Sequence, residues 1–479
     1  MTKPTYTKKI GLLLGPFLFI IIQILPIVLI SEQADTVIAT ALWMVTWWVT
    51  EAVSISVTSL LPLLLFPLFK VMSISDVGSN YGSPIVFLFF GGFVLALALE
   101  KVNLHKRIAL NIINKTGTTP NNVILGFMIA TAFMSMWISN TASTVVMLPI
   151  ALSVINLLID DADGFTKKDQ NFALSVMLGI AFSANAGGIA TVIGTPPNSV
   201  LIGLLESEYN IEVSFFKWIL VGLPFSIVLI TIIYFVLVKW MFPNTGLVFS
   251  ASKNVINDEL EKLGKTSKKE KHVLITFGVI VSLWIFRSLI NSLIPSLGLS
   301  DTMISILGAL ALFTIPFNFK KGDFILQWND THKLAWGILI LFGGGLALAK
   351  GMSESGIIDI IAAFISSSDI SVLVMAALLI TLMLFMTELM SNVALTAVLA
   401  PVVAGIAIGL EIPMLYLLIP VTIASSCAFM LPMATPPNAI VFASGYVKVS
   451  EMARVGIILN LIAVILLILL FKFFLPLLF

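Results

Sequence analysis

Long apolar runs alternate with short polar connections along almost the whole chain. A helix that crosses a membrane needs about 20 mostly apolar residues, and the runs of that kind predict about eleven crossings. They lie near 10–30, 36–50, 53–69, 84–100, 171–206, 214–241, 272–294, 300–317, 334–350, 413–446 and 452–478. Composition agrees, because 59% of the residues are hydrophobic and 11% are charged, as in polytopic membrane proteins. The pattern predicts an all-α polytopic membrane protein whose first helix lies within residues 1–35.

Two further apolar segments, 121–158 and 370–409, are each long enough to enter the membrane and return. Each is interrupted midway by a Ser-Asn pair, Ser139–Asn140 in the first and Ser391–Asn392 in the second. Small polar residues favour turns and helix starts. Both segments are therefore predicted to be re-entrant helical hairpins.

Three short motifs occur twice, in the same order. The matched pairs are FGGFVLALA from Phe90 with FGGGLALAK from Phe342, SNTA from Ser139 with SNVA from Ser391, and TPPN from Thr195 with TPPN from Thr435. The adjacent prolines cannot donate backbone hydrogen bonds and should break the helices over 171–206 and 413–446. The chain thus divides into two repeats, 36–241 and 272–479, joined by a linker over 242–271.

Basic residues predict the orientation of these repeats. They occur at Lys3, Lys8, Lys9, Lys101, Lys106, Arg107, Lys167, Lys168, Lys320, Lys321, Lys448 and Arg454, and in the linker. If the N-terminus is cytoplasmic, all of these connections are cytoplasmic, as the positive-inside rule requires. The first hairpin then enters from the cytoplasm and the second from outside, so the repeats are inverted. Inverted repeats with broken helices are typical of secondary transporters, whose sites lie at mid-membrane.

Several other classes of function are excluded by the sequence. The net charge of +1 offers no basic surface for nucleic acid, and the single cysteine, Cys427, excludes an intramolecular disulfide. The sequence contains no Walker A loop, HExxH helix or GxSxG elbow, which argues against an ATP-driven pump or a hydrolase. We therefore expect neither an enzyme nor an organic cofactor.

The interruptions themselves offer groups that can bind ions. Each should start a new helix at a capping residue, often followed by proline. The residues concerned are Ser139, Asn140, Thr195, Pro196, Ser391, Asn392, Thr435 and Pro436. Four helix N-termini of roughly +0.5 charge each would offset about two negative charges, which suits a dianion. Backbone carbonyls at the other ends, with Ser, Thr and Asn oxygens, suit Na⁺.

These motifs resemble those of the divalent-anion/sodium symporter (INDY-like) family, and the resemblance covers nearly the whole chain. The family hallmark is a duplicated SNT motif at hairpin tips that face unwound T/S-P-P loops. The resemblance implies carboxylate contacts from Asn140, Thr141, Asn392 and Thr435. It implies one sodium site near Ser135, Ser139, Asn140 and the Gly188 carbonyl, and a second near Thr387, Asn392 and Ala434. It also implies a homodimer in which a transport domain moves against a scaffold like an elevator.

Two residues of the second hairpin differ from the first. Val393 stands where the usual motif has a threonine, so a substrate contact or the second sodium site loses a hydroxyl. Glu388 matches Met136 of the first repeat, and an acid at that depth is a functional candidate. We expect Glu388 either to brace the hairpin through hydrogen bonds or to tune ion or proton coupling. Because of Val393, both sodium symport and sodium-independent exchange stay open.

The sequence thus predicts a carrier of four- or five-carbon dicarboxylates such as succinate, malate, fumarate or 2-oxoglutarate in the cytoplasmic membrane. The alternatives are a sodium-independent dicarboxylate exchanger, a citrate or sulfate carrier and, from another class, an anion channel. Sulfate is less favoured because the site suits two separated carboxylates.

Overall fold

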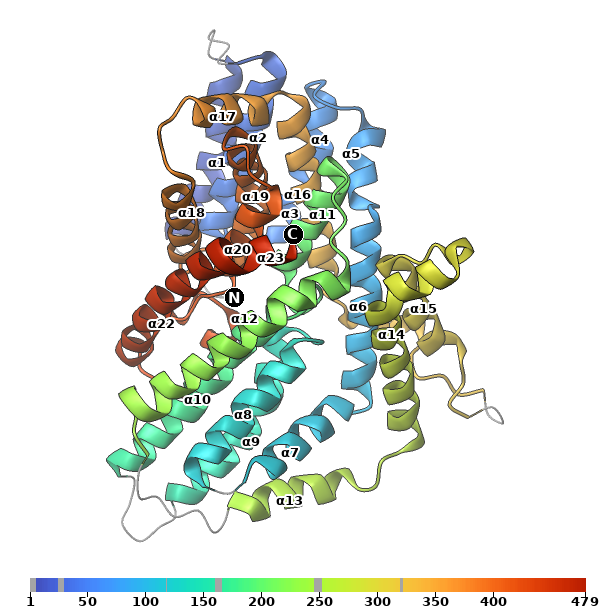
Figure 1. The fold of residues 1–479 in the computed structure, drawn as a ribbon, viewed down its shortest axis with the longest axis vertical. Coiled ribbons are helices and arrows are strands. Elements are labelled where there is room, and N and C mark those ends of the chain that lie inside the picture. The colour runs from blue at the N-terminus through green and yellow to red at the C-terminus, as the bar shows by residue number, and fades with distance from the viewer. Residues whose placement is uncertain (1–5, 25–29, 118, 160–165, 245–251, 319–321) are drawn as a thin grey trace.

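The fold is built from helices, as a computed structural model shows (Figure 1). The structure describes residues 6–24, 30–117, 119–159, 166–244, 252–318 and 322–479. Within these ranges no β-strand is formed, and the one isolated β-bridge joins Asn318 to Asp323. The predicted all-α class is confirmed.

The N-terminal helices form one side of the molecule. They are α1 (Tyr6–Ile24), α2 (Glu32–Thr50), α3 (Ile55–Thr58), α4 (Leu61–Leu68) and α5 (Ile74–Tyr81). The apolar run over 53–69 is not one helix, because α4 restarts at Leu61 with Pro62 in its first turn, where a missing N–H costs nothing. Helix α1 packs on α2, and both α2 and α4 pack against α16 of the second repeat.

The first repeat contains a hairpin and a broken helix. From residue 84 on, its helices are α6 (Pro84–Lys101), α7 (Leu104–Thr116), α8 (Pro120–Ser135), α9 (Asn140–Ile159), α10 (Lys167–Gly188), α11 (Pro196–Tyr209) and α12 (Phe215–Phe235), which continues as the π-helix η1 (Val236–Met241). The chain turns between α8 and α9 at the Ser-Asn pair, and α10 and α11 are separated by an unwound segment that ends at Thr195.

The second repeat has the same order of elements. Its matching helices are preceded by α13 (Ser252–Leu263), α14 (Lys268–Leu293), the short 3₁₀ helix η2 (Pro295–Leu297), α15 (Asp301–Thr314) and the 3₁₀ helix η3 (Trp328–Lys333). The helices that match the first repeat are α16 (Trp336–Glu354), α17 (Ile357–Ser366), α18 (Val372–Met386), α19 (Asn392–Gly409), α20 (Met414–Ser425), α21 (Pro436–Ala443) and α22 (Val449–Leu469). The chain ends with the π-helix η4 (Leu470–Phe474) and α23 (Leu475–Leu478). Helices α18 and α19 form the second hairpin, and α20 and α21 are the two parts of the second broken helix.

Four α-helices lie in segments that the apolar pattern left as connections: α5, α7, α13 and α17. They are short, and apolar and polar residues alternate around them at helical spacing. A search for continuous apolar runs misses such amphipathic helices. Part of the expected linker over 242–271 is therefore helical, while residues 160–165 and 245–251 lie outside the described ranges.

Seven helical segments of the described chain are long and apolar enough to cross a membrane. They are Tyr6–Ile24, Ile74–Lys101, Phe215–Met241, Lys268–Leu293, Trp336–Glu354, Asn392–Gly409 and Val449–Leu478. The other apolar helices are shorter, because the breaks and hairpin turns divide the runs from which about eleven crossings are expected. The protein is thus a multi-pass membrane protein.

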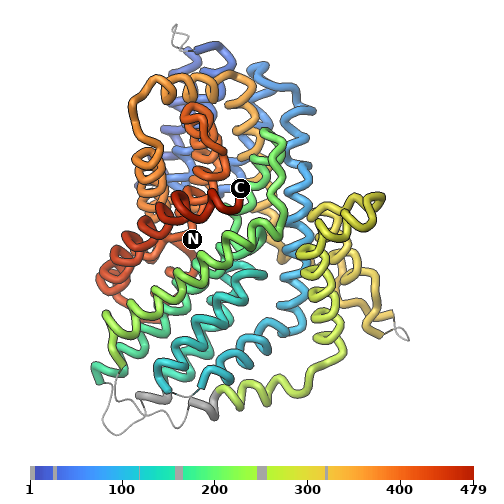
Figure 2. Tube along the Cα trace, in the orientation of Figure 1, coloured from blue at the N-terminus to red at the C-terminus, as the bar shows by residue number. Residues whose placement is uncertain are grey.

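The two repeats pack against each other crosswise. Helix α21, the second part of the second broken helix, packs on the first hairpin limb α9 and on α10. Helix α11, the second part of the first broken helix, packs on the second hairpin limb α19 and on α20. In Figure 2 the green helix α11 lies beside the orange helices of the second half. Each break therefore lies against the hairpin of the other repeat.

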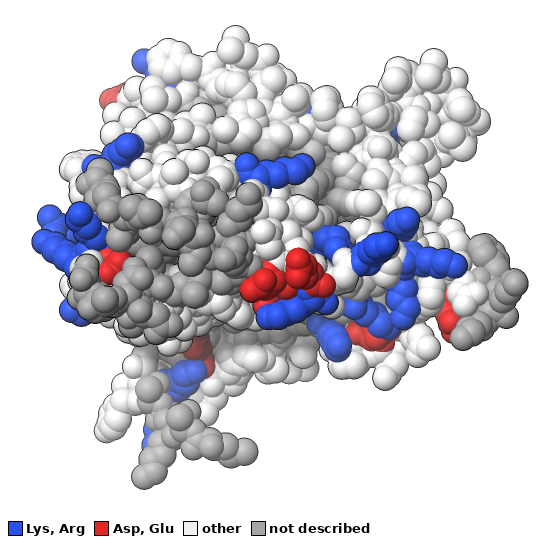
Figure 3. Space-filling model, turned by 90° about the horizontal axis from the view of Figure 1, so that it is seen from below, with Lys and Arg blue, Asp and Glu red and all other residues white. Residues whose placement is uncertain are grey.

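One end of the molecule carries many basic side chains, shown in blue in Figure 3. Ion pairs tie the elements there together: Lys101 with Asp330 at 2.6 Å, and Arg107 with Glu270 at 2.5 Å. Lys106 of α7 pairs at 2.8 Å with Glu259 of α13. The salt bridges from Lys106 and Lys262 hold the pKa of the Glu259 carboxyl below its usual value.

Candidate functional site: two hairpin tips and two helix breaks

The first hairpin tip presents polar side chains at the start of α9. Ser139 precedes the helix, and its hydroxyl accepts a hydrogen bond from the Ala142 N–H at 3.1 Å, as expected for a capping serine. Ser139 and Thr141 are exposed and Asn140 is half-buried. The tip is therefore not covered by other parts of the described chain.

Behind this tip, several oxygens converge on Ser135. Its Oγ lies 2.5 Å from Asn140 Oδ1 and 2.7 Å from the Ala184 carbonyl oxygen. A hydroxyl has one proton, so it can donate to only one of these oxygens. With the Asn140 amide oxygen facing Ser135, the other oxygen pair shares no proton, an arrangement that a cation would stabilise.

Gly188 is part of the same cluster. A Cβ atom there would lie 2.6 Å from Asn140 Oδ1, so the Asn140 side chain would have to shift to make room for it. The Gly188 carbonyl oxygen in turn lies against Gly194, where a Cβ would come within 2.5 Å of it. The structure thus brings together Ser135, Asn140 and Gly188, and it adds Ala184, which the sequence analysis missed because a backbone carbonyl leaves no signal in sequence.

The second hairpin repeats this arrangement with different residues. Thr387 Oγ1 lies 2.7 Å from Asn392 Oδ1 and 2.7 Å from the Ser425 carbonyl oxygen. Thr387 is fully buried, and Asn392 is half-buried. The side chain of Ser391 makes no capping hydrogen bond, unlike Ser139, so that expected cap is absent. Half-buried Val393 follows Asn392 in the first turn of α19.

These two clusters consist of neutral oxygens. Among the described residues, no group of three or more His, Cys, Asp or Glu side chains could hold a metal ion. Carbonyl, hydroxyl and amide oxygens at unwound helix ends are the ligands by which transporters hold Na⁺. The residues fit a monovalent cation at each tip.

The two helix breaks differ in how their threonines are used. Thr195 and Thr435 both have the extended backbone of an N-cap and are followed by Pro196 and Pro436. Thr435 Oγ1 accepts a hydrogen bond from the Asn438 N–H at 3.4 Å, whereas the Thr195 side chain makes no capping bond. Thr195 is therefore the N-cap residue of α11, as expected, but its hydroxyl does not supply the capping hydrogen bond.

The fourth residue of each TPPN motif fastens the unwound segment before it. Asn198 Nδ2 lies 2.8 Å from the Thr191 carbonyl and also reaches the Gly188 carbonyl at 3.4 Å. Asn438 Nδ2 donates to the carbonyls of Ala428 and Leu431, each at 3.1 Å. These bonds pair carbonyls that the broken helices leave free. The sequence analysis did not single out Asn198 or Asn438 as functional residues, although both are the last residue of the repeated TPPN motif.

Glu388 is a buried carboxylate behind the second tip. Its Oε1 accepts hydrogen bonds from the N–H groups of Phe429 and Met430 at 2.8 and 2.9 Å, and its Oε2 accepts one from Leu431 at 3.1 Å. Asn460 of α22 donates a fourth bond at 2.7 Å. The bracing expected of Glu388 is therefore present, and it joins the hairpin, the unwound segment and α22.

A polar cleft runs beside the first tip along α9. A cavity of about 350 Å³ begins at Ala142, next to Thr141, and a second of about 260 Å³ extends to Ser153. The two share Asn103, His105 and Val146. Burial lowers the pKa of His105, whose Nδ1 contacts the Leu99 carbonyl. The cleft connects the first tip with the end of the molecule that carries the basic side chains.

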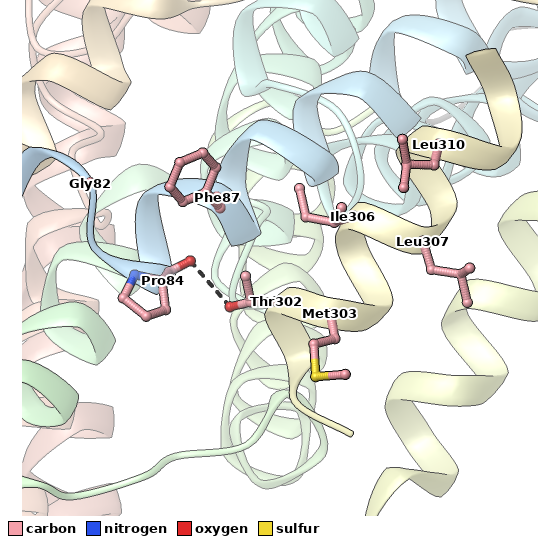
Figure 4. A pocket seen from close by; sticks show the side chains of 8 residues that line it. All are labelled: Gly82, Pro84, Phe87, Thr302, Met303, Ile306, Leu307 and Leu310. Carbon is pink, nitrogen blue, oxygen red and sulfur yellow. Dashed lines mark hydrogen bonds between the residues drawn. The ribbon is translucent and has the colours of Figure 1, made fainter. Parts of the chain in front are cut away.

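A larger groove of about 560 Å³ lies between α6 and α15, away from the tips (Figure 4). Its lining is apolar apart from Thr302, whose hydroxyl donates to the Pro84 carbonyl at 3.1 Å. No charged side chain lines this groove. It offers nothing that would hold an anion.

An all-helical multi-pass protein with paired hairpin tips and helix breaks is a membrane transporter rather than an enzyme. The family model for the sodium:sulfate symporter transmembrane region matches residues 6–479. The chain belongs to this family, as the motif resemblance predicts.

Named relatives extend the comparison. The chain is 40% identical over 476 residues to the sodium-dependent dicarboxylate transporter SdcS of Staphylococcus saprophyticus, with 98% of this chain and 92% of the relative covered. It is 39% identical over 480 residues to the protein of the same name from Staphylococcus aureus strain USA300, covering 98% and 91%.

Two solved transporter structures share the fold at low sequence identity. The YdaH transporter of Alcanivorax borkumensis gives a TM-score of 0.56 at 12% identity, with 84% of this chain and 87% of that chain covered. MtrF of Neisseria gonorrhoeae gives 0.53 at 14% identity, with 85% of each chain covered.

Proposed function

We propose that this protein is a secondary transporter that carries four- or five-carbon dicarboxylates together with Na⁺ across the cytoplasmic membrane. The observation that carries the proposal is the repeated oxygen cluster, Ser135 with Asn140 and Thr387 with Asn392, at two hairpin tips. Relatives at 39–40% identity that are named sodium-dependent dicarboxylate transporters support it. Succinate, malate, fumarate and 2-oxoglutarate are the candidate substrates.

The substrate would lie between the tips and the breaks. Its carboxylates would accept hydrogen bonds from Asn140, Thr141, Asn392 and Thr435, next to Ser139, Ser391, Val393, Thr195, Pro196 and Pro436. The N-termini of α9, α11, α19 and α21 would supply the positive potential that no lysine or arginine supplies at these positions. Two separated carboxylates fit paired tips better than one compact anion such as sulfate.

Sodium would bind beside the substrate at the two oxygen clusters. The first would use Ser135, Ser139, Asn140 and the Gly188 carbonyl, and the second Thr387, Asn392 and Ala434. A cation close to each carboxylate lowers the electrostatic cost of burying a dianion, which links substrate affinity to Na⁺. Sodium-independent exchange is the second candidate, and the missing hydroxyl at Val393 favours it.

The basic end of the molecule would face the cytoplasm, as the positive-inside rule requires. The first hairpin would then enter from the cytoplasm, the second from outside, and the cleft along α9 would give cytoplasmic access to the first tip. Single cysteines placed within 166–170 or 265–271 should react with impermeant thiol reagents only from inside. Reaction from outside would contradict this orientation.

Movement would follow the elevator scheme in a homodimer. The hairpins, the broken helices, α12 and α22 would shift as one body against α1–α6 and α14–α16. The crosswise packing of each break on the opposite hairpin supports such a unit.

Uptake into proteoliposomes tests the proposal. An inward Na⁺ gradient should stimulate succinate uptake, and malate or fumarate should inhibit it while lactate and alanine do not. Uptake driven by internal dicarboxylate without any Na⁺ effect would favour the exchanger. Flux without acceleration by trans-substrate would indicate a channel, and equal inhibition by lactate would contradict a dicarboxylate site.

A further inference from the structure

Asn185 of α10 links the first repeat to the second helix break. It is 1% exposed, and its Nδ2 lies 3.1 Å from Thr435 Oγ1, 3.2 Å from the Ala428 carbonyl and 3.4 Å from Asn438 Oδ1. Three oxygens of the opposite repeat thus share the two protons of this amide, and the Thr435 hydroxyl is the nearest of the three. Neither the repeated motifs nor the family resemblance singles out this residue.

The orientation of the Asn185 amide follows from its neighbours. Asn438 Nδ2 is already used by the Ala428 and Leu431 carbonyls, so Asn438 turns its Oδ1 towards Asn185. A flipped Asn185 amide would place its oxygen against two further acceptors, Ala428 O and Asn438 Oδ1. The NH₂ group must therefore face Thr435.

This arrangement determines the role of the Thr435 hydroxyl. A hydroxyl oxygen accepts two hydrogen bonds and donates one. Both acceptor positions of Thr435 are occupied, one by Asn185 Nδ2 at 3.1 Å and one by the Asn438 N–H at 3.4 Å. Within the described residues the hydroxyl proton has no acceptor, so it is free for a ligand.

We infer that Asn185 is a positioning residue for substrate selection. It holds Thr435 as an obligate donor to one carboxylate of the transported dicarboxylate. The inference rests on the proposed function and adds a residue that does not itself touch the substrate. Thr195, the matching threonine, has no such support, because no side chain of the described residues donates a hydrogen bond to its hydroxyl and the hydroxyl makes no capping bond. The two breaks therefore recognise the substrate unequally.

A double-mutant cycle between Asn185 and Thr435 tests the inference. Thr435→Val removes the donor and should raise the succinate KM about tenfold, which corresponds to about 1.4 kcal/mol. Asn185→Ala should raise KM at least about threefold, a smaller change because the hydroxyl is retained. In the Thr435→Val background, Asn185→Ala should add nothing to KM. The maximal rate should stay close to wild type in all three variants.

Matched variants separate positioning from a structural role. Ser183→Ala alters another buried polar side chain of α10 and should leave KM unchanged. Asn185→Asp replaces the donor by an acceptor and adds a negative charge, so it should raise KM more than Asn185→Ala does. If Asn185→Ala does not fold, the same comparison is made with Asn185→Ser, whose side chain is one bond too short to donate to Thr435 and which should raise KM as expected for Asn185→Ala but less than Asn185→Asp does.

The outcomes are distinguishable. Additive KM effects in the cycle, or a fall in maximal rate without a KM change, would overturn the role of Asn185 while leaving the proposed function intact. Absence of succinate transport by the wild-type protein would overturn the proposed function itself.

Discussion

The two halves of the molecule share their motifs but not the bonds that support them. In the first repeat, the unwound segment between α10 and α11 is fastened only by neutral groups, among them Asn198 and the Thr191 hydroxyl, which donates to the Met136 carbonyl at 2.5 Å. In the second, the segment between α20 and α21 is longer and is held by the carboxylate of Glu388. The two hairpin tips therefore have similar sequences, but only the second has a carboxylate behind it.

This difference bears on how each tip would hold a cation. Glu388 directly follows Thr387, so a negative charge lies behind the second oxygen cluster, whereas Met136 stands at the matching position of the first. A nearby negative charge favours a cation, and it does so more strongly when both are buried. If a cation binds at the second cluster as we propose, Glu388 would offset the hydroxyl that is missing at Val393.

The largest expected effect of a single substitution is at Glu388. Glu388→Gln turns an NH₂ group towards backbone N–H groups and removes a buried charge that receives four hydrogen bonds, so it should destabilise the protein by about 3 kcal/mol. Met136→Leu at the matching position should cost less than about 1.5 kcal/mol. Thermal unfolding of both purified variants measures this. If Glu388→Gln and Met136→Leu lowered the midpoint temperature of unfolding equally, the two unwound segments would be held equally well, which would contradict the comparison.

The next effect concerns the first oxygen cluster. Gly188→Ala would place a Cβ 2.6 Å from Asn140 Oδ1 and displace that ligand, so the Na⁺ concentration for half-maximal succinate uptake should rise at least about tenfold. Gly278→Ala on α14 is the control, because nothing lies within 4 Å of its Cβ position. If Gly188→Ala keeps the wild-type Na⁺ dependence, Gly188 does not border a cation site.

The smallest effect is expected at Val393. Val393→Thr restores the missing hydroxyl, worth about 0.5–1.5 kcal/mol for one hydrogen bond or oxygen ligand. Half-saturation by Na⁺ should fall a few-fold, and Val393→Ala, which adds no oxygen, should not reproduce the change. Identical Na⁺ activation curves for valine and threonine would mean that Glu388 alone sets the second site, or that position 393 only packs.

The sequence allowed prediction of the features that interrupt apolar runs. The Ser-Asn pairs and the TPPN motifs are polar or proline-containing breaks within otherwise continuous hydrophobic segments, so the turn before Asn140 and the unwound segment before Pro196 could be located from the pattern. Helices α7 and α17 could not, because each is too short and too amphipathic for a search based on membrane thickness.

The supporting contacts were beyond sequence reasoning for a different reason. Asn185 reaches Thr435 across 250 positions of sequence, and Glu388 meets the N–H of Phe429 across 41. Such contacts depend on how the repeats pack, which a local pattern does not encode. The unequal capping of the two breaks was also beyond a local pattern: Asn198 and Asn438 make the same kind of side-chain bonds, yet only Thr435 accepts the backbone N–H of its asparagine.

The most direct test of the central claim is the affinity of the purified protein for succinate as Na⁺ replaces K⁺ at constant ionic strength. Paired oxygen clusters beside a dianion predict that succinate binds more tightly as Na⁺ rises, and that Ser135→Ala and Thr387→Ala each weaken this dependence. A succinate affinity that is the same in Na⁺ and in K⁺, for wild type and both variants, would contradict the account.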